Sequence, residues 1–177
     1  MKYLVVSDIH GSAAWLKKFM EIVKNENPDK VILLGDVYYH GPRNALPEGY
    51  APMEVAEMLN SIADMIISVK GNCDAEVDQM ISNFEMNEKY ETEISGLRYL
   101  FVHGHHLDFQ NLPKEYNVVF GGHTHVSSIT NYDGTVYVNP GSLSIPKGGT
   151  TNGYAKIEGT KISLHNLQGE TLHEIVL

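Results

Sequence analysis

The sequence predicts an α/β protein, and two patterns support this fold class. The first half alternates short apolar runs with segments of helical periodicity, which is typical of βαβ units. The second half contains three pairs of short apolar runs, and each pair is separated by a dipeptide that ends in glycine and favours a hairpin turn. We therefore expect an α/β domain whose second half adds a further, largely antiparallel sheet.

The first half is expected to contain three strands and three helices. Ser12 is a suitable N-cap for the first helix, in which apolar side chains recur at helical spacing. The pair Asn27-Pro28 ends that helix, because a residue that precedes proline disfavours the helical conformation. The predicted strands span residues 2–7, 30–34 and 65–69, and the predicted helices span residues 15–23, 53–63 and 75–81.

The second half is expected to consist mostly of strands. Residues 37–52, which follow the second predicted strand, hold three prolines and are predicted to form a loop. A loop of this length in a compact domain is often functional. The predicted hairpins pair residues 91–94 with 97–102, 129–132 with 135–138 and 154–157 with 161–164, and residues 117–120 form a further strand.

Composition and charge exclude several classes of protein. The 177 residues are expected to form a single domain, 1–177, and 42% hydrophobic with 20% charged residues suits a soluble globular chain. A net charge of -9 argues against broad binding to nucleic acid or to anionic membranes. A single cysteine cannot form an intrachain disulfide. No apolar stretch has the length of a membrane span, and the strand pattern at the N-terminus leaves no room for a signal peptide, so a cytoplasmic location is expected.

Five of the apolar runs end in side chains that bind metals. Open α/β sheets place their sites just beyond the carboxyl ends of the strands, so five such strands in one sheet would bring these side chains to one edge. The donors are oxygen and imidazole, which suit Mn(II), Fe or Zn better than a soft metal or an iron–sulfur cluster. Seven donors exceed the needs of one tetrahedral site and fit two sites that share Asp36. The candidate ligands are Asp8, His10, Asp36, Asn72, His103, His123 and His125.

In their order along the chain, these motifs resemble those of the calcineurin-like metallophosphoesterases. The phrase Gly71-Asn72-Cys73-Asp74 and the small size resemble the YfcE-type phosphodiesterase branch in particular. The resemblance implies a four-layer α/β/β/α sandwich with two mixed β-sheets. It is carried by Asp8-x-His10, Gly35-Asp36, Gly71-Asn72, His103-Gly104-His105 and Gly122-His123-Thr124-His125, with Asn139-Pro140-Gly141-Ser142 as a further family-like segment.

The resemblance also implies a centre with two divalent metal ions. A hydroxide that bridges the ions would attack the phosphorus of a small phosphodiester in line with the leaving oxygen. Mn(II) is the metal expected first, and Fe, Zn and Ni are alternatives that tolerate the same donors. One ion would be held by Asp8, His10, Asp36 and His125, and the other by Asp36, Asn72, His103 and His123.

Cys73 departs from the family pattern, since many members have a histidine there that is thought to protonate the leaving group or to steady the transition state. A thiol is a weak hydrogen-bond donor, and nearby cations favour the thiolate, which has no proton to give. General acid catalysis is typically worth ~10²–10⁴-fold in rate. We therefore expect slow hydrolysis of esters with alkoxide leaving groups and faster hydrolysis of activated aryl esters, unless Cys73 is only a small buried filler.

Four more side chains are candidates for work outside the ligand set. With Cys73, the candidate catalytic residues are Asp74, which would either cap a helix or orient Cys73, and His105, which would either support His103 or lie exposed in a loop. The candidate substrate-binding residues are His40 and Arg43, in the loop after Asp36. Arg43 is suited to a bidentate contact with phosphate, although a solvated loop position is the commoner case.

Three functions remain open at the level of the sequence. The first is a metal-dependent phosphodiesterase acting on a small-molecule phosphodiester. The second is a catalytically weak or inactive protein-interaction scaffold on the same fold, and the third is a phosphomonoesterase. Retention of all seven candidate ligands favours an enzyme, whereas Cys73 keeps the scaffold alternative open. The apolar content of the second half also permits a homo-oligomer.

Overall fold

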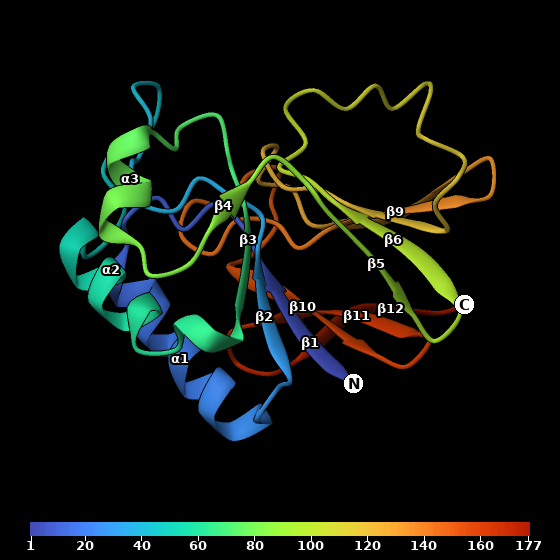
Figure 1. Cartoon of the computed structure of the whole chain (residues 1–177), viewed down its shortest axis with the longest axis horizontal. Helices are drawn as coiled ribbons and strands as arrows, with labels where there is room; N and C mark the ends of the chain where they lie inside the picture. Colours follow the sequence, from blue (N-terminus) through green and yellow to red (C-terminus); the bar gives the residue numbers. More distant parts are fainter.

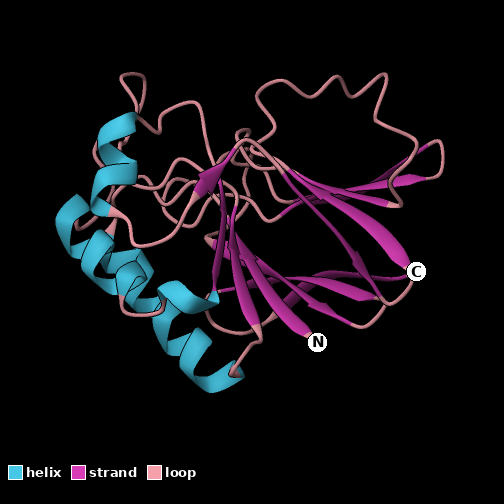
Figure 2. Ribbon diagram, viewed as in Figure 1, coloured by secondary structure: helices cyan, strands magenta, loops and turns pink.

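The computed structural model of the protein describes all 177 residues and contains two β-sheets packed face to face, with the helices on one outer face (Figures 1 and 2). The predicted helices are present within a few residues of their expected ends. Ser12 is the N-cap of the first helix, as predicted, and its hydroxyl accepts a hydrogen bond from the Trp15 backbone N–H. The helices are α1 (Ala13–Glu26), α2 (Pro52–Asn60) and α3 (Glu76–Ile81), with the 3-10 helix η1 (Ala63–Met65) between α2 and α3.

The first sheet joins the N-terminal strands to the C-terminal ones. Its order is β12-β11-β10-β1-β2-β3-β4, in which β1 to β4 are parallel and β10 to β12 are antiparallel. The third predicted hairpin therefore extends the first sheet and does not join the second, which corrects the expectation. The strands are β1 (Lys2–Val6), β2 (Lys30–Leu33), β3 (Ile66–Val69), β4 (Met86–Asn87), β10 (Gly153–Glu158), β11 (Lys161–Asn166) and β12 (Thr171–Val176).

The second sheet is mixed and not largely antiparallel. Strands β6, β7 and β9 are parallel neighbours, and β5 and β8 pair antiparallel at the two edges. The prediction of an α/β fold with two mixed β-sheets is thus confirmed. The expectation that the strands of the second sheet would be largely antiparallel was wrong. Its strands are β5 (Tyr90–Ile94), β6 (Leu97–Phe101), β7 (Val118–Phe120), β8 (Ser128–Tyr132) and β9 (Thr135–Asn139), in the order β5-β6-β7-β9-β8.

Alternation of side chains along β1 builds both sides of the first sheet. Leu4 and Val6 belong to the core under the helices, whereas Tyr3 and Val5 belong to the core between the two sheets. Successive side chains of a strand point to opposite faces, so a fully apolar strand is what a sheet covered on both faces requires. The same strand therefore holds the helical layer and the second sheet together.

The outer face of the second sheet is covered by an irregular segment instead of a helix. Residues 102–117 contain no helix or strand, and in Figure 1 they arch over β6 and β9. Leu107, Phe109 and Leu112 from this segment pack against a core that includes Val119 and Tyr137. The fourth layer that the family resemblance implies is therefore supplied here by apolar loop side chains.

Two strands and one capping role were not predicted correctly. Strand β12 is an edge strand whose side chains are mostly exposed, so its sequence lacks the apolar pattern that marks a buried strand. Strand β4 has only two residues. Asp74 does not cap α3, because Ala75 is the N-cap residue and Asp74 bonds to other backbone groups. None of the helices combines the length and the apolar character that crossing a bilayer requires.

His165, in β11, is predicted to make stability depend on pH. Burial lowers the pKa of this ring in the folded protein. Below about pH 6.5 the ring is therefore protonated more readily in the unfolded chain than in the folded protein. Stability is therefore kept above that pH and is lost as the pH falls toward the lowered pKa. We expect the decrease in the free energy of unfolding between about pH 7 and about pH 5, measured with urea, to be smaller in His165→Gln than in the natural protein.

His173→Gln is the matched control, because His173 is exposed on the neighbouring strand and pairs with Leu164. In this variant, the decrease in the free energy of unfolding between the two pH values should equal that of the natural protein. An equal pH dependence in His165→Gln and the natural protein would contradict the assignment.

Candidate metal centre

The candidate ligands come from five strand ends that lie in two sheets. Strands β1, β2 and β3 belong to the first sheet, and β6 and β7 belong to the second. The expectation of one sheet edge was therefore wrong, but the carboxyl ends of the two sheets converge, and the side chains still meet. Contacts between the two sheets show this convergence directly, since the His123 N–H donates to Asp8 Oδ2 at 3.0 Å, and Nδ1 of His103 lies 2.7 Å from the carbonyl oxygen of Leu34.

The backbone at these strand ends is strained in a consistent way. Eight non-glycine residues have a positive φ, and five of them are candidate ligands. A left-handed conformation costs a non-glycine residue of order 1 kcal/mol and persists only where the surroundings impose it. It turns the chain sharply after β1, β2 and β7. The five are Asp8 (φ 55°), His10 (50°), Asp36 (54°), His123 (64°) and His125 (61°).

Three histidines present the same nitrogen to the centre. Nδ1 of His10, His103 and His125 lies 2.7 Å from the carbonyl oxygens of Tyr39, Leu34 and Ile145, respectively. A carbonyl can only accept, so each Nδ1 carries a proton and, in the neutral ring, Nε2 keeps its lone pair. Metal-binding histidines are commonly oriented by such bonds. The Nε2 atoms of His10 and His125 lie 3.3 Å apart, a separation that a cation between them would favour.

Asp8 and Asp36 supply the negative charge of the centre. Asp8 Oδ2 accepts hydrogen bonds from the Ser7 hydroxyl and the His123 N–H, whereas Asp8 Oδ1 is fully buried and has no hydrogen-bond partner. That free oxygen lies 3.3 Å from His125 Nε2 and 3.6 Å from His10 Nε2. A buried carboxylate oxygen without a partner is costly, so the donor set fits a cation placed against it.

Asp36 lies between the two predicted ligand sets. Its Oδ1 accepts the Cys73 N–H at 2.8 Å, which leaves Oδ2 free for the centre. Oδ2 lies 3.8 Å from Nε2 of His10 and 3.4 Å from Nε2 of His103, one histidine from each set. Asn72 joins the second set, because its Oδ1 lies 3.0 Å from His103 Nε2. The ring of His123 is 5.2 Å from that of His103, centroid to centroid.

The ionisation of these groups follows from their mutual contacts. Burial favours the neutral acid, but the adjacent His10 and His125 rings lower the pKa of Asp8 far below its ordinary value. Burial likewise favours the neutral ring of His103, yet the bond to Asp36 raises its pKa to about 9. Both carboxylates are therefore anionic at neutral pH, and protons on the histidines compensate charge that a divalent cation would compensate when bound.

Asp74 organises the loops that carry the ligands. Its carboxylate accepts three backbone N–H groups: Asp36 at 2.8 Å, Val37 at 2.8 Å and Gly71 at 2.7 Å. These bonds tie the end of β2 to the end of β3, and a Cβ on Gly71 would collide with the Asp36 carboxylate. The Asp74 carboxylate therefore connects the two ligand loops through their backbone, and its role in orienting Cys73 and the ligands stays a prediction.

The family-like segment at residues 139–142 is hydrogen-bonded to the backbone of the ligand loops. The Ser142 hydroxyl donates to the carbonyl of Asp8 at 2.7 Å, and the Asn139 side chain donates to the carbonyl of Gly122 at 2.8 Å. Both side chains are buried. They satisfy carbonyl groups that the left-handed turns leave without a partner in the sheets.

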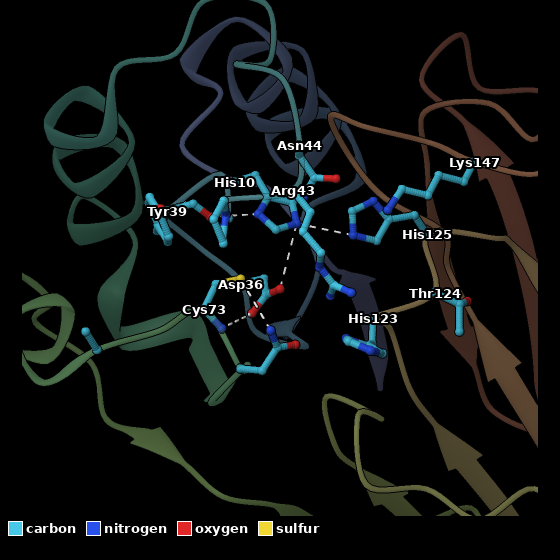
Figure 3. Close-up of a pocket in the computed structure, with 14 residues that line it drawn as sticks. His10, Asp36, Tyr39, Arg43, Asn44, Cys73, His123, Thr124, His125 and Lys147 are labelled. Atoms are coloured by element: carbon cyan, nitrogen blue, oxygen red, sulfur yellow. Dashed lines mark hydrogen bonds and ion pairs between the residues drawn. The ribbon is translucent and has the colours of Figure 1, made fainter.

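The centre opens into a cavity of about 920 Å³ (Figure 3). Two cationic side chains line it: Arg43, whose role in substrate binding stays a prediction, and Lys147, which the sequence pattern did not single out. The backbone N–H of Lys147 donates to the carbonyl of His125 at 3.0 Å, so the lysine is tied to a ligand loop. Neither cation forms an ion pair with an acidic side chain within 4 Å.

The remaining candidates differ in their access to the cavity. Cys73 lines it, and burial and the charge of Asp36 raise the pKa of its thiol to about 12. His40 and His105 are not among the lining residues. The ring of His40 packs edge-on against Tyr39 and Tyr50, and that of His105 lies 5.4 Å from His103. His40 thus packs within its loop and does not line the cavity.

Comparison with known proteins agrees with this geometry. Residues 1–161 match the sequence model of the protein family described as the calcineurin-like phosphoesterase superfamily domain. The chain belongs to this superfamily. It is 40% identical over 175 residues to "Phosphodiesterase YfcE" of Escherichia coli K12, an alignment that covers 97% of this chain and 95% of that protein. The chain is therefore an enzyme of the class that hydrolyses phosphoester bonds, which the metal-ligand pattern predicted.

Solved structures confirm the fold. The structure of E. coli YfcE, described as a phosphoesterase, superposes with a TM-score of 0.95 at 38% identity and covers 99% of both chains. Zinc-bound Vps29 from Entamoeba histolytica superposes with a TM-score of 0.66 at 20% identity and covers 99% of both chains. At 20% identity, the similarity to Vps29 concerns the fold alone.

Asp74→Asn is expected to weaken metal binding without touching a metal donor. The amide would present N–H groups to backbone N–H groups, and residues that orient metal ligands typically contribute about 10–100-fold in affinity. We expect a loss of this size in Mn(II) affinity by calorimetric titration, together with a loss of roughly 1–3 kcal/mol in the free energy of unfolding.

Asp78→Asn is the matched control. Asp78 is also buried and accepts a backbone N–H, but that group belongs to Ala75 at the start of α3. It should lose stability and keep its Mn(II) affinity. If Asp74→Asn bound Mn(II) as tightly as the natural protein, its positioning role would be refuted.

Proposed function

We propose that this protein is a metal-dependent phosphodiesterase that hydrolyses small phosphodiesters. The observation that carries the proposal is the position of Asp36 Oδ2 between His10 and His103, on the floor of an open cavity. A carboxylate oxygen shared by two sets of donors is the arrangement that two adjacent cations require, and paired metals are a recurrent device in phosphoryl transfer. The 40% identity with a curated phosphodiesterase supports the same activity.

The proposed cofactor is a pair of divalent ions, with Mn(II) expected first and Fe, Zn or Ni as alternatives. The two ions would supply the hydroxide that attacks phosphorus in line with the leaving oxygen, and would neutralise charge on the phosphate. Hard carboxylate and amide oxygens mixed with imidazole support this choice of metals. The proposed ligands are Asp8, His10, Asp36 and His125 for one ion, and Asp36, Asn72, His103 and His123 for the other.

The proposed contribution of the chain's own cations is to hold the phosphate. The guanidinium of Arg43 lies over the cavity and has no acidic partner, so it is available for a bidentate contact with two phosphate oxygens (Figure 3). Lys147 lines the cavity beside His125 and adds a second positive charge. In a chain with a net charge of -9, these two cations provide the local attraction for an anionic substrate.

Cys73 limits the proposed chemistry at the leaving group. A thiol is a weak hydrogen-bond donor, and cations bound beside Cys73 would favour its thiolate, which has no proton to give. His105, whose pKa is lowered mainly by burial, does not line the cavity and so is not placed as the missing acid; its proposed role is to pack beside His103. We therefore assign slow turnover to substrates whose leaving group must be protonated.

Two alternatives have weaker support. A protein-interaction scaffold on the same fold would not need buried carboxylates, strained turns and unpaired cations around one cavity. A phosphomonoesterase would use the same centre, and comparison of rates on p-nitrophenyl phosphate and bis-p-nitrophenyl phosphate separates the two activities. We further propose that the enzyme acts in the cytoplasm as a single domain, either alone or as a homo-oligomer, on a small-molecule substrate.

Hydrolysis of bis-p-nitrophenyl phosphate is expected to require both the metal and Asp36. Mn(II) should support turnover, EDTA should abolish it, and Asp36→Ala should lower kcat/KM at least about 10³-fold because both ligand sets lose a donor. Release of p-nitrophenolate measures the rate. Asp64→Ala, at an exposed carboxylate in η1, is the control and should act like the natural protein. Turnover that neither EDTA nor Asp36→Ala reduces would reject the proposal.

Cys73→His is expected to extend the substrate range. The imidazole would offer a proton to an alkoxide, so the rate on phosphodiesters with alkyl leaving groups should rise by about 10²-fold, with little change for p-nitrophenyl esters. Rates of alcohol and p-nitrophenolate release give the comparison, and Cys73→Ala separates chemistry from packing. Equal rates on both substrate types in the natural protein would show that Cys73 imposes no such limit.

A further inference from the structure

Ser7 is a buried serine at the point where the ends of the two sheets meet. It directly follows β1 of the first sheet and is 1% exposed. Gly122 follows the end of β7 in the second sheet, and a Cβ added to it would lie only 1.8 Å from Ser7 Oγ. A residue without a side chain is therefore required opposite this hydroxyl, and the two sheet ends touch here.

The hydroxyl of Ser7 has one hydrogen-bond partner, the carboxylate of the next residue. Ser7 Oγ donates to Asp8 Oδ2 at 2.6 Å, a length typical of a strong bond to an ionised acceptor. Neighbouring residues of a strand point to opposite faces, so this bond depends on the left-handed turn at Asp8, where φ is 55°. The turn at Asp8 and the contact with Gly122 thus hold donor and carboxylate in one arrangement.

This bond makes the two oxygens of the Asp8 carboxylate different. Oδ2 accepts the Ser7 hydroxyl and, at 3.0 Å, the His123 N–H. Oδ1 is buried without a hydrogen-bond partner and lies 3.3 Å from Nε2 of His125 and 3.6 Å from Nε2 of His10. A carboxylate oxygen has about two lone-pair sites, so those of Oδ2 are occupied and those of Oδ1 are free. Only Oδ1 is therefore available to a cation.

The difference between the two oxygens decides how many coordination positions Asp8 can fill. Carboxylates bind cations through one oxygen or through both. With Oδ2 occupied, Asp8 would fill one position, whereas a free Oδ2 would allow it to fill two. A catalytic metal centre needs positions that the protein leaves open to the reacting groups. A hydroxyl on Oδ2 would therefore change the centre without contacting a metal or a substrate.

We propose that Ser7 is a positioning residue that restricts Asp8 to ligation through Oδ1 alone. This inference rests on the proposed metal-dependent function and adds to it a residue that belongs to neither ligand set. Asp8 belongs to only one of the two proposed sets, so the effect of Ser7 falls on one of the two ions. A serine that merely filled the core would instead contribute to stability and leave both metal-binding steps as they are.

Titration of metal-free protein with Mn(II), followed by calorimetry, tests the proposal. In Ser7→Ala, one of the two binding steps should weaken by about tenfold and the other should be unchanged. Ser7→Thr keeps the hydroxyl and should bind like the natural protein. Ser68→Ala is the matched control, because Ser68 is also 1% exposed and lies in β3 of the same sheet, but its hydroxyl bonds only to a backbone carbonyl, at 3.4 Å.

The visible spectrum of the Co(II)-loaded protein provides a second readout. Absorption by Co(II) weakens as more ligand atoms surround the ion, so it reports the number of ligand atoms and their geometry. In Ser7→Ala the freed Oδ2 should also bind, and the bands should be weaker than in the natural protein. The bands of Ser7→Thr and Ser68→Ala should keep the natural intensity, because loss of packing alone adds no ligand atom.

The possible outcomes are distinct. Two unchanged Mn(II)-binding steps and an unchanged Co(II) spectrum in Ser7→Ala would overturn the inference. Equal losses of affinity in Ser7→Ala and Ser7→Thr, or in Ser7→Ala and Ser68→Ala, would assign the effect to packing and would also overturn it. Failure of the natural protein to bind Mn(II) or Co(II) would instead reject the proposed metal-dependent function.

Discussion

The structure depends on the placement of one carboxylate, Asp36, at the junction of the two sheets. The Cys73 N–H holds its Oδ1, so Oδ2 is left between His10 from the first sheet and His103 from the second. This position exists only if the carboxyl ends of β2 and β6 converge, and that requires apolar strands that pack on both faces. The large core between the sheets is therefore a condition for the site as well as a source of stability.

The site is costly to assemble, and its costs have a common cause. Five ligands adopt a left-handed backbone, and two carboxylates are buried within a few ångströms of each other. Strain of order 1 kcal/mol per turn and the desolvation of charge must be offset elsewhere. Asp74, Asn139 and Ser142 offset part of it by satisfying the backbone of the strained loops. The remainder is what a bound cation would compensate, because it neutralises the charge that makes the cluster unfavourable.

The sequence predicted features that depend on local chemistry. Ser12 as an N-cap and the turns at Gly96 and Gly134 follow from the residues themselves, and the structure has them. The distribution of strands between sheets was not predictable in this way, because a hairpin such as 154–164 pairs equally well with either sheet until the whole core is formed. Lys147 shows the same limit at the site: a loop lysine carries no local signal, and only the fold places it beside His125.

The cavity is asymmetric, and its asymmetry follows from the same loops that position the ligands. The loop after β2 carries Tyr39 and Arg43, the loop after β3 carries Cys73, and the loop that follows β9 carries Lys147. Tyr39 and Cys73 thus lie on one side of the centre, while Lys147 lies on the opposite side (Figure 3). A phosphodiester has a retained and a departing ester group, and an asymmetric site binds them in one order.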